Sequence, residues 1–382
     1  MSAPPFELAL PPRISFGAGV AASLPSVVSS HGSRALVATG SSPQRVADLV
    51  EAVRGACLEV VVVPVGGEPD VDDARRAAEL GRSIGADVVV AIGGGSVIDL
   101  AKAAAMLLGN GGDPMDYLEV VGLGQPILRD PLPLVAVPTT AGTGAEVTAN
   151  AVLTSREHGV KASLRHPLMV PRHALVDPLL TVGCSPAVTA AAGMDALTQC
   201  LEPYVSHRAN PATDGWAATG LVHAGRGLRR AVAVGTDVAA RTDMALASLM
   251  GGLALANAKL GAVHGFAGIV GGLTGAPHGA ICAALLGPVC RANVARADAA
   301  LLARFDDIAR WLTGDPQARA ADGLDWIDST CALLQVPGLA SYGLGPDDAA
   351  TVVAGAARAS SMQGNPVVLA EQELLAVYTA AL

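Results

Sequence analysis

Short apolar runs alternate with amphipathic stretches through the first half of the chain. The runs that have the length and unbroken hydrophobicity of buried strands are residues 35–39, 58–63, 88–92 and 134–137. Helical periodicity marks residues 43–54, 70–84 and 97–108. Residues 6–16 suggest an opening hairpin that turns at Pro11 and Pro12. The alternation predicts a parallel, Rossmann-like sheet with helices on both faces.

The pattern changes near Ser185 and Pro186, a serine cap followed by proline at the first helical position. Beyond this point strand patterns vanish, and one helical pattern follows another to Leu382. We therefore predict an α/β domain over residues 1–178 and an all-α domain over residues 179–382. A chain of 382 residues is long enough for each domain to bury a substantial core.

Charge and hydropathy narrow the partners that we expect. The net charge is -9 and no basic cluster occurs, which argues against nucleic acid and anionic membranes. Hydrophobic residues make up 51% of the chain, so a membrane span has to be considered. The longest apolar region, residues 244–273, is interrupted by Asn257, Lys259 and His264 and lacks about 20 continuous apolar residues. We interpret it as buried helices of a soluble protein.

The cysteines and the N-terminus favour a cytoplasmic protein. The chain has 6 scattered cysteines, with no CxxC pair, and these are typical of reduced core residues. Cys200 lies beside the metal-binding segment proposed below, but a packed thiol is the simpler interpretation. No basic region precedes a hydrophobic one at the N-terminus, so we expect no secretory signal.

A glycine cluster follows the third apolar run. Gly93, Gly94 and Gly95 with Ser96 connect this run to the helical stretch 97–108. Glycines let the backbone approach a phosphate, and the first helical turn presents its amides and the positive end of its dipole. Tight strand-to-helix turns also use glycine for steric reasons alone. Asp99 and Lys102, on one face of the helix, support a diphosphate site, although Lys102 could be a solvated helix residue.

A second group of polar residues lies in the apolar, Ala/Gly-rich second half. It consists of Asp195 in Gly-Met-Asp-Ala-Leu-Thr, His264 in Val-His-Gly-Phe, and His278 in Pro-His-Gly-Ala. One carboxylate and two imidazoles from three helices can hold a divalent cation and leave a position for substrate. One such histidine alone is more often a core residue, so the prediction depends on the combination.

These motifs, in this order, resemble the iron-containing (group III) alcohol dehydrogenase family, which has glycerol dehydrogenases, maleylacetate reductases and dehydroquinate synthases as relatives. The resemblance rests on residues 93–102, 137–148 and 193–198, the two-histidine run, residues 210–214 and residues 364–366. It implies the iron alcohol dehydrogenase fold, with a dinucleotide-binding first domain and a metal- and substrate-binding second domain. It also implies a homodimeric, metal-dependent, NAD(P)-linked oxidoreductase that interconverts a small alcohol and an aldehyde or ketone.

The resemblance assigns roles to individual residues. It implies that Asp195, His264 and His278 bind the metal and carry the catalysis, with Lys161 as a further catalytic and cofactor-binding candidate, for which a loop charge is the alternative. The implied contacts of the cofactor are Gly94, Gly95, Ser96, Asp99, Thr139, Thr140, Thr143, Val147, Lys161 and Leu179.

Two positions depart from the family pattern. Iron-dependent members have a further histidine ligand four residues after the aspartate, where this chain has Gln199. An amide oxygen is a weaker ligand than imidazole, so we expect a three-ligand site for Fe²⁺ or Zn²⁺, with Gln199 as a fourth metal contact or a substrate hydrogen-bond donor. Gly268 stands where the family often has another histidine, which predicts a roomier, less polar substrate pocket.

Alternative activities remain open at this point. The first is a metal-independent, maleylacetate reductase-type enzyme. The second is a dehydroquinate synthase-like lyase, although a lysine-poor second half lacks the basic residues that its substrate needs. A non-catalytic dinucleotide- or metal-binding protein is the third.

The segment after the first apolar run bears on cofactor choice. NAD-preferring relatives carry an aspartate there, whereas residues 39–45 of this chain contain no carboxylate. Gly40 and Ser41, a helix beginning near Pro43, and Arg45 would tolerate a 2′-phosphate. We predict that NADP is accepted alongside NAD. The alternative is that Ser42 only caps a helix and selectivity is absent.

Overall fold

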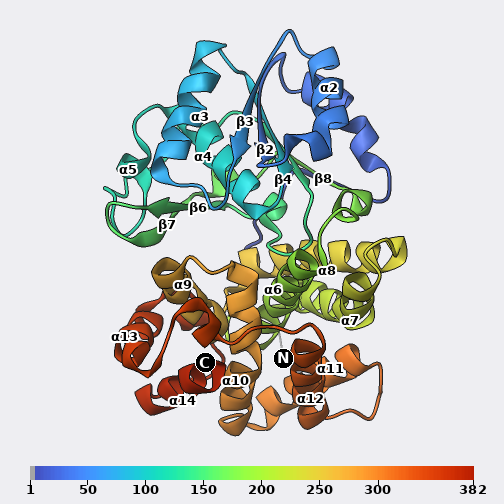
Figure 1. The fold of residues 1–382 in the computed structure, drawn as a ribbon, viewed down its shortest axis with the longest axis vertical. Helices are drawn as coiled ribbons and strands as arrows, with labels where there is room; N and C mark the ends of the chain where they lie inside the picture. Colours follow the sequence, from blue (N-terminus) through green and yellow to red (C-terminus); the bar gives the residue numbers. More distant parts are fainter. Residues whose placement is uncertain (1–4) are drawn as a thin grey trace. The chain divides into compact units, whose positions relative to one another are not determined.

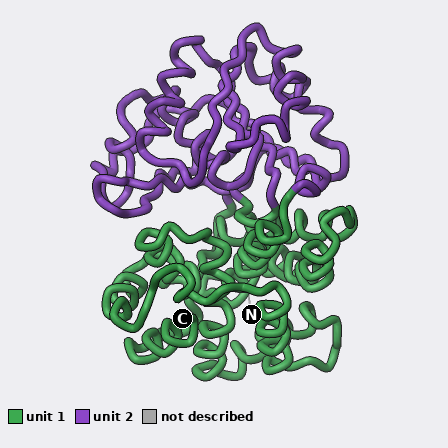
Figure 2. Tube along the Cα trace, viewed as in Figure 1, with its two compact units in different colours: residues 1–8, 141–144, 184–382 green, residues 9–140, 145–183 purple. Residues whose placement is uncertain are grey.

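The computed structural model describes residues 5–382, which divide into two compact units (Figure 2). The first comprises Ala9–Thr140 and Ala145–Gly183. The second comprises Cys184–Leu382, Ala141–Gly144 and the described part of Met1–Leu8. No sequence pattern signalled that the short segment Ala141–Gly144 belongs with the helical unit.

All strands of the described residues lie in the first unit (Figure 1). They are β1 Arg13–Phe16, β2 Arg34–Gly40, β3 Glu59–Val65, β4 Val88–Gly93, β5 Leu134–Pro138, β6 Asn150–Ser155, β7 Val160–Arg165 and β8 His173–Val176. One parallel sheet contains 6 of them in the order β1-β8-β5-β4-β2-β3, and β6 and β7 form an antiparallel pair. The parallel sheet confirms the predicted α/β architecture.

The helices of this unit cover both faces of the sheet. They are α1 Leu24–Ser29, α2 Ala47–Ala56, α3 Val71–Ser83, α4 Gly95–Asn110 and α5 Pro114–Tyr117, with short 3₁₀ turns at η1 Val20–Ser23, η2 Pro43–Val46, η3 Ala145–Val147, η4 Pro167–Met169 and η5 Pro178–Thr181. Successive residues of β2 point to opposite faces: Leu36 packs in the core that contains α3 and α4, and Val37 in the core that contains α1 and α2. Because both faces are covered, the central strands β4 and β5 are apolar and buried along their whole length.

Two local predictions for this unit were wrong. The hairpin expected over residues 6–16 does not form, because Arg13–Phe16 instead pairs in parallel with His173–Val176 and so extends the sheet at its edge. The helix expected from Pro43 begins at Ala47, and Pro43–Val46 is a 3₁₀ turn. The hydroxyl of Ser42 makes no capping hydrogen bond to this turn, so helix capping does not explain that serine.

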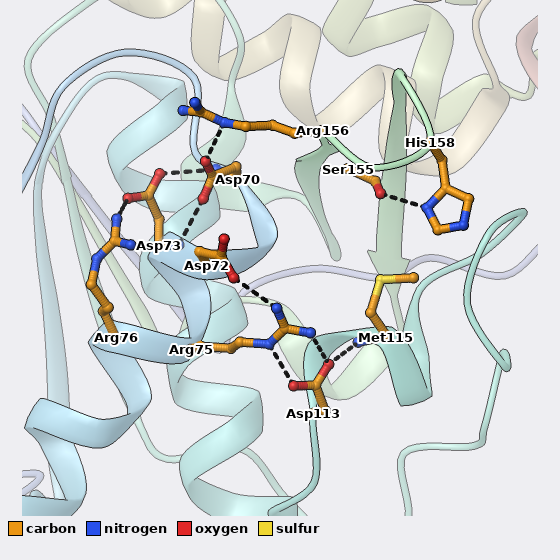
Figure 3. A network of polar contacts seen from close by, with 10 residues as sticks. All are labelled: Asp70, Asp72, Asp73, Arg75, Arg76, Asp113, Met115, Ser155, Arg156 and His158. Carbon is orange, nitrogen blue, oxygen red and sulfur yellow. Dashed lines mark hydrogen bonds and ion pairs between the residues drawn. The ribbon is translucent and has the colours of Figure 1, made fainter.

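Polar contacts hold the β6–β7 hairpin to the start of α3 (Figure 3). Asp70 caps α3, accepting a hydrogen bond from the amide of Asp73 at 2.8 Å. Arg156, which follows β6, forms an ion pair with Asp70 at 2.6 Å. On the next turns of α3, Arg75 binds Asp113 at 2.6 Å and so joins α3 to the start of α5. The ion pair of Arg156 thus connects α3 to the hairpin that carries Lys161, one of the predicted site residues.

The second unit is entirely helical over residues 184–382. Its helices are α6 Pro186–Val205, α7 Pro211–Ala233, α8 Val238–Ala258, α9 Ala262–Thr274, α10 His278–Ala295, α11 Ala299–Thr313, α12 Ala320–Leu333, α13 Ala349–Arg358 and α14 Glu371–Ala381, with 3₁₀ turns at η6 Leu339–Tyr342, η7 Pro346–Asp348 and η8 Ser360–Gly364. Ser185 caps α6 as the sequence predicts, accepting a hydrogen bond from the amide of Val188 at 3.3 Å. This unit confirms the predicted all-α second part.

Helix α6 forms the centre of the helical unit and packs against α7, α8 and α10. Every residue of α6 from Gly193 to Val205 is buried. Helix α8 has 21 residues and a mean hydropathy of 1.2 in its most apolar window, which would suit a membrane span by length and composition. Because 67% of that window is buried inside the fold, the core position of α8 accounts for its composition equally well.

Candidate metal centre and dinucleotide loop

A row of polar side chains follows one face of the buried helix α6. Asp195, Gln199 and Glu202 are spaced by four and three residues, which places them on the same side of the helix, and all three are buried. Burying carboxylates is costly unless they are paired with charges or hydrogen-bond donors. The row therefore marks the part of the helical core where polar chemistry is concentrated.

The structure brings the three predicted metal ligands together around Asp195. Its Oδ1 atom lies 3.5 Å from Nε2 of His264 and 3.7 Å from Nε2 of His278. The two imidazole rings have their centroids 5.2 Å apart. His264 is buried in the first turn of α9, whereas the side chain of His278, at the start of α10, is 37% exposed. One donor atom from each of three helices thus points to a common position.

Gly279 lets α10 approach α6 closely enough for this arrangement. A Cβ atom at Gly279 would lie 2.1 Å from the carbonyl oxygen of Ala191 and 3.3 Å from Cβ of Asp195. No other residue fits at this contact, because the neighbouring atoms belong to the helix backbone. The Pro-His-Gly motif therefore places His278 beside Asp195 through a close helix contact.

Glu202 fixes the orientation of His264, and the sequence analysis missed it. Its Oε2 accepts a hydrogen bond from Nδ1 of His264 at 2.7 Å, and its Oε1 accepts one from the amide of Val263 at 2.7 Å. With Nδ1 bound to Glu202, Nε2 is the ring nitrogen of His264 that faces Asp195 and that a metal would use. Metal-binding histidines almost always donate their second ring nitrogen to such a partner.

Cys282 joins the group from the same face of α10 as His278, one turn later. Its Sγ atom lies 3.6 Å from Nε2 of His278 and 3.9 Å from Nε2 of His264. One donor atom from each of Asp195, His264, His278 and Cys282 falls within 4.8 Å of every other. The scattered cysteines predicted packing residues only, so this position of Cys282 was not expected. The spacing of four residues after His278 was the available signal.

Opposite charges in this cluster stabilise the ionised forms of its members. Burial by itself would raise the pKa of Asp195, but the positive charges of His278 and His264 lower it. The charge on Cys282 raises the pKa of His278 to about 9. Burial opposes ionisation of Cys282, yet the two imidazoles lower the pKa of its thiol. Anionic donors are therefore favoured around a position that would accept positive charge.

Two orphaned oxygens support a cation at this position. Among the described residues, Oδ1 of Asp195 and Oε1 of Gln199 are buried without a hydrogen-bond partner. Buried polar atoms of this kind are rare and call for an explanation such as a bound ion. The donor set of oxygen, nitrogen and sulfur atoms fits a divalent transition metal.

Cys200 differs from Cys282 in its surroundings. Its Sγ atom donates to the carbonyl oxygen of Ala247 at 3.3 Å, and burial raises the pKa of the thiol. Cys200 thus behaves as a packed thiol.

The predicted phosphate loop lies at the carboxyl end of β4. A Cβ atom at Gly93 would lie 2.4 Å from Cγ2 of Val97, and one at Gly94 would lie 3.0 Å from Oγ1 of Thr140. The amide of Thr139 donates to the carbonyl oxygen of Gly93 at 3.0 Å. The loops after the neighbouring strands β4 and β5 therefore meet, and Gly95 and Ser96 begin the helix α4. Ligands of open α/β sheets bind at this end of the strands.

Asp99 and Lys102 contact the β6–β7 side of the unit. Asp99 accepts a hydrogen bond from the amide of Val152 at 3.1 Å. Lys102 donates to Oγ1 of Thr148 at 2.9 Å and to the carbonyl oxygen of Asn150 at 2.8 Å. Because its side chain is fully buried, the interpretation of Lys102 as a solvated helix residue is wrong.

The remaining predicted site residues are spread over several elements. Lys161, on β7, forms an ion pair with Glu68, and Val147 is buried in η3. Leu179 is exposed in η5, and Thr143 belongs to the segment Ala141–Gly144 of the helical unit. Gly40 ends β2 and is followed by the exposed Ser41.

Comparison with known proteins agrees with these features. The family described as iron-containing alcohol dehydrogenase matches residues 11–178, and the C-terminal domain of the Fe-containing alcohol dehydrogenase family matches residues 189–382. EutG of Salmonella typhimurium, a probable alcohol dehydrogenase, is 36% identical over 336 residues, which cover 86% of this chain and 81% of EutG.

Solved structures agree over the whole chain. The crystal structure of a 1,3-propanediol oxidoreductase matches with a TM-score of 0.91 and 32% identity, covering 99% of this chain and 100% of that one. Sulfoacetaldehyde reductase from Bifidobacterium kashiwanohense, in complex with NAD⁺, matches with a TM-score of 0.89 and 30% identity over 99% of both chains.

These relatives are alcohol oxidoreductases, so neither a metal-independent maleylacetate reductase-type enzyme nor a dehydroquinate synthase-like lyase is favoured. The chain belongs to the iron-containing alcohol dehydrogenase family and is a metal-dependent, NAD-linked alcohol oxidoreductase.

Proposed function

We propose that Asp195, His264 and His278 hold one divalent metal ion, Fe²⁺ or Zn²⁺, and that the enzyme interconverts a small alcohol and its aldehyde or ketone with NAD or NADP. The observation that carries this proposal is that Nε2 of His264 and Nε2 of His278 lie 3.5 and 3.7 Å from Oδ1 of Asp195, a buried oxygen that makes no hydrogen bond. Without a metal, this buried oxygen would lack a partner, which is energetically costly.

The reaction moves a hydride between the substrate carbon and the nicotinamide, while the alcohol oxygen loses or gains a proton. A bound divalent ion supplies Lewis-acid polarisation of the carbon–oxygen bond. Asp195 contributes a buried negative charge, and Glu202 accepts a hydrogen bond from Nδ1 of His264, which leaves Nε2 as the ring nitrogen that would face the metal. Asp195 and His264 are buried among the apolar residues around α6, which strengthens the electrostatic contact between them, whereas the partly exposed His278 lies on the side that solvent reaches.

The cofactor contacts form the second part of the proposal. We assign the diphosphate to Gly94, Gly95 and Ser96 at the start of α4, where the first amides of a long helix favour an anion. Thr139 and Thr140, in the adjoining loop, would contact the nucleotide. The further contacts that the family resemblance implies are Gly40, Ser41, Asp99, Thr143, Val147, Lys161 and Leu179.

NADP should be accepted as well as NAD. Residues 40–45 offer no carboxylate that would repel a 2′-phosphate, and Ser41 and Ser42 are exposed. The hydroxyl of Ser42 is not used as a helix cap. Arg45 is exposed in the 3₁₀ turn that follows and supplies a positive charge.

The charge of Lys161 already has a partner in Glu68, so its proposed role needs a test of its own. Two variants separate a catalytic role from a structural one. If Lys161 acts on substrate or cofactor, Lys161→Met lowers kcat/KM far more than Glu68→Gln, at equal thermal stability. If the ion pair is only structural, both variants lower stability together and leave kcat/KM similar.

The test of the proposed function is metal analysis followed by an activity panel. The purified protein should contain close to one divalent ion per chain, and a panel that includes ethanol, 1,3-propanediol and sulfoacetaldehyde should change nicotinamide absorbance with NAD(H) or NADP(H). Asp195→Asn should abolish both metal binding and turnover but leave dinucleotide binding intact. Asp243→Asn, in a buried carboxylate that contacts His223 at 2.8 Å, is the matched control and should keep the metal. Normal turnover by Asp195→Asn would refute the proposal.

We extend the proposal to assembly and location. Family resemblance supports a homodimer, which light scattering on the purified protein would test. The six cysteines, all free, support a reducing compartment such as the cytoplasm.

A further inference from the structure

We infer that Cys282 completes the metal site as a thiolate, the fourth ligand in a chain that has Gln199 where the family has its third imidazole, and that it gives the site a preference for Zn²⁺ over Fe²⁺. The inference rests on the proposed function, because it requires a metal at Asp195, His264 and His278. It adds a ligand that the family pattern does not contain, and it replaces Gln199 as the fourth contact.

The separations between donor atoms carry the first part of the argument. Tetrahedral zinc with its usual bond lengths places nitrogen and oxygen ligands about 3.3 Å apart and a sulfur ligand about 3.5 Å from a nitrogen. The separations here are 3.5 and 3.7 Å from Oδ1 of Asp195 to the imidazoles, and 3.6 and 3.9 Å from Sγ of Cys282 to the same nitrogens. Small side-chain movements would therefore bring all four atoms to bonding distance of one ion.

The position of Cys282 on α10 makes this approach a property of the fold. His278 and Cys282 are one helical turn apart on one face, so a metal bound by the first lies within reach of the second. The contact of Gly279 with Ala191 holds that face of α10 against α6. The thiol is fully buried and its hydrogen-bonding contacts are the two imidazoles.

Two other thiols of the chain, the buried Cys200 and the partly exposed Cys331, have different partners. Cys200 donates to the carbonyl oxygen of Ala247 at 3.3 Å, and Cys331 donates to that of Ala283 at 3.6 Å. A carbonyl partner is the usual arrangement for a packed thiol, whereas Cys282 points to a carboxylate and two imidazoles that already converge. The surroundings of Cys282 are those of a ligand.

Donor chemistry favours sulfur over the amide. A thiolate is anionic and polarisable, whereas the side-chain oxygen of Gln199 is a neutral, weak donor. Thiolate ligands select softer ions, and catalytic zinc sites combine sulfur with imidazole, whereas carboxylate and carbonyl ligands suit harder ions. A ligand set of carboxylate, two imidazoles and thiolate therefore shifts the preference toward Zn²⁺. Binding of substrate would then raise the coordination number to five, which catalytic zinc accommodates.

Cobalt substitution tests the ligand directly, because a thiolate bound to Co²⁺ gives an intense sulfur-to-metal charge-transfer band in the near ultraviolet. The apoprotein is titrated with Co²⁺ for the wild type, Cys282→Ser, Cys290→Ser and Asp195→Asn. Cys290, also on α10 and buried, serves as the matched control. We expect the charge-transfer band in the wild type and in Cys290→Ser. Cys282→Ser should lose the band but still bind Co²⁺, with a lower affinity than the wild type. Circular dichroism verifies that each variant is folded.

The outcomes separate this inference from the proposed function. If the wild type binds one Co²⁺ per chain, and Asp195→Asn abolishes binding, but no charge-transfer band appears, the role of Cys282 is refuted and the metal site stands. If the wild type binds no Co²⁺, or if Asp195→Asn binds it normally, the proposed metal site itself is refuted.

Competition between ions tests the selectivity. Each apoprotein is equilibrated anaerobically with Zn²⁺ and Fe²⁺ against a chelator. We expect Cys282→Ser to lose Zn²⁺ affinity by at least the roughly 10- to 100-fold that removal of an outer-shell partner costs. Its loss of Fe²⁺ affinity should be smaller, so the zinc-to-iron ratio falls. An unchanged ratio would overturn the proposed preference.

Discussion

Replacing Glu202 by glutamine should weaken metal binding without removing any of the proposed ligands. The carboxylate of Glu202 accepts two hydrogen bonds at 2.7 Å, one from Nδ1 of His264 and one from the amide of Val263. A glutamine has only one acceptor oxygen, so its NH₂ group must face one of these donors. Either the α9 amide loses its partner, or His264 moves its proton to Nε2 and can no longer bind a metal through that atom.

The size of the effect follows from these two possibilities. Loss of a partner that orients a metal-binding histidine costs about 10- to 100-fold in affinity, or about 1.4–2.7 kcal/mol. An unpaired buried amide would lower the free energy of unfolding by about 1–3 kcal/mol. We therefore expect Glu202→Gln to bind Zn²⁺ at least about 10-fold more weakly than the wild type.

The assay is a competition between apoprotein and a fluorescent chelator, with urea unfolding of the same apoproteins. Asp243→Asn is the matched control, because Asp243 also accepts from a histidine nitrogen, Nδ1 of His223, at 2.8 Å. The control should lose stability but keep the metal affinity. Wild-type affinity together with wild-type stability in Glu202→Gln would show that Glu202 does not set the state of His264.

Three further predictions address stability and cofactor choice. Burial lowers the pKa of Lys102 from 10.5 to about 8, so between these pH values the unfolded chain carries a proton that the folded chain lacks. The free energy of unfolding of the wild type, relative to that of Lys102→Met, should therefore rise as the pH increases through this window. A difference in urea unfolding that stays constant with pH would contradict the burial of a charged Lys102. Gly268 lies in α9 with open space where a Cβ would stand, so Gly268→Ala should raise the free energy of unfolding by about 0.5–1 kcal/mol. Gly279→Ala should lower both the free energy of unfolding and the metal affinity, because its Cβ would clash with α6. Denaturation that ranks the two variants in the opposite order would refute the close contact at Gly279. Ser41→Asp should lower kcat/KM for NADPH relative to NADH by about 10-fold, because a carboxylate there would repel the 2′-phosphate. An unchanged ratio in steady-state kinetics would show that Ser41 does not lie beside the ribose.

Much of the α/β fold could be predicted because its central strands are apolar along their whole length. The runs that became β4 and β5 are of this kind, and those that became β2 and the edge strand β3 are apolar over most of their length. The hairpin of β6 and β7 escaped prediction, since polar residues such as Thr154 and Lys161 alternate with buried ones and blur the pattern. Strand β8, with His173 and only three apolar residues, is too short to stand out.

The candidate site was partly predictable for a related reason. Asp195, His264 and His278 belong to motifs that a reader can recognise along the chain. Glu202 and Cys282 gain their meaning only through packing, because the first meets α9 across the core and the second meets His264 through the approach of α10 to α6. Their spacings of seven residues after Asp195 and four after His278 become signals once the helices are known.

The most direct test of the metal centre is anomalous diffraction from crystals of the metal-loaded enzyme, recorded at the zinc and iron absorption edges. The account predicts one peak within about 2.0–2.3 Å of a carboxylate oxygen of Asp195, Nε2 of His264 and Nε2 of His278. A loaded, active enzyme with its anomalous peak elsewhere, or with none at these three residues, would contradict it.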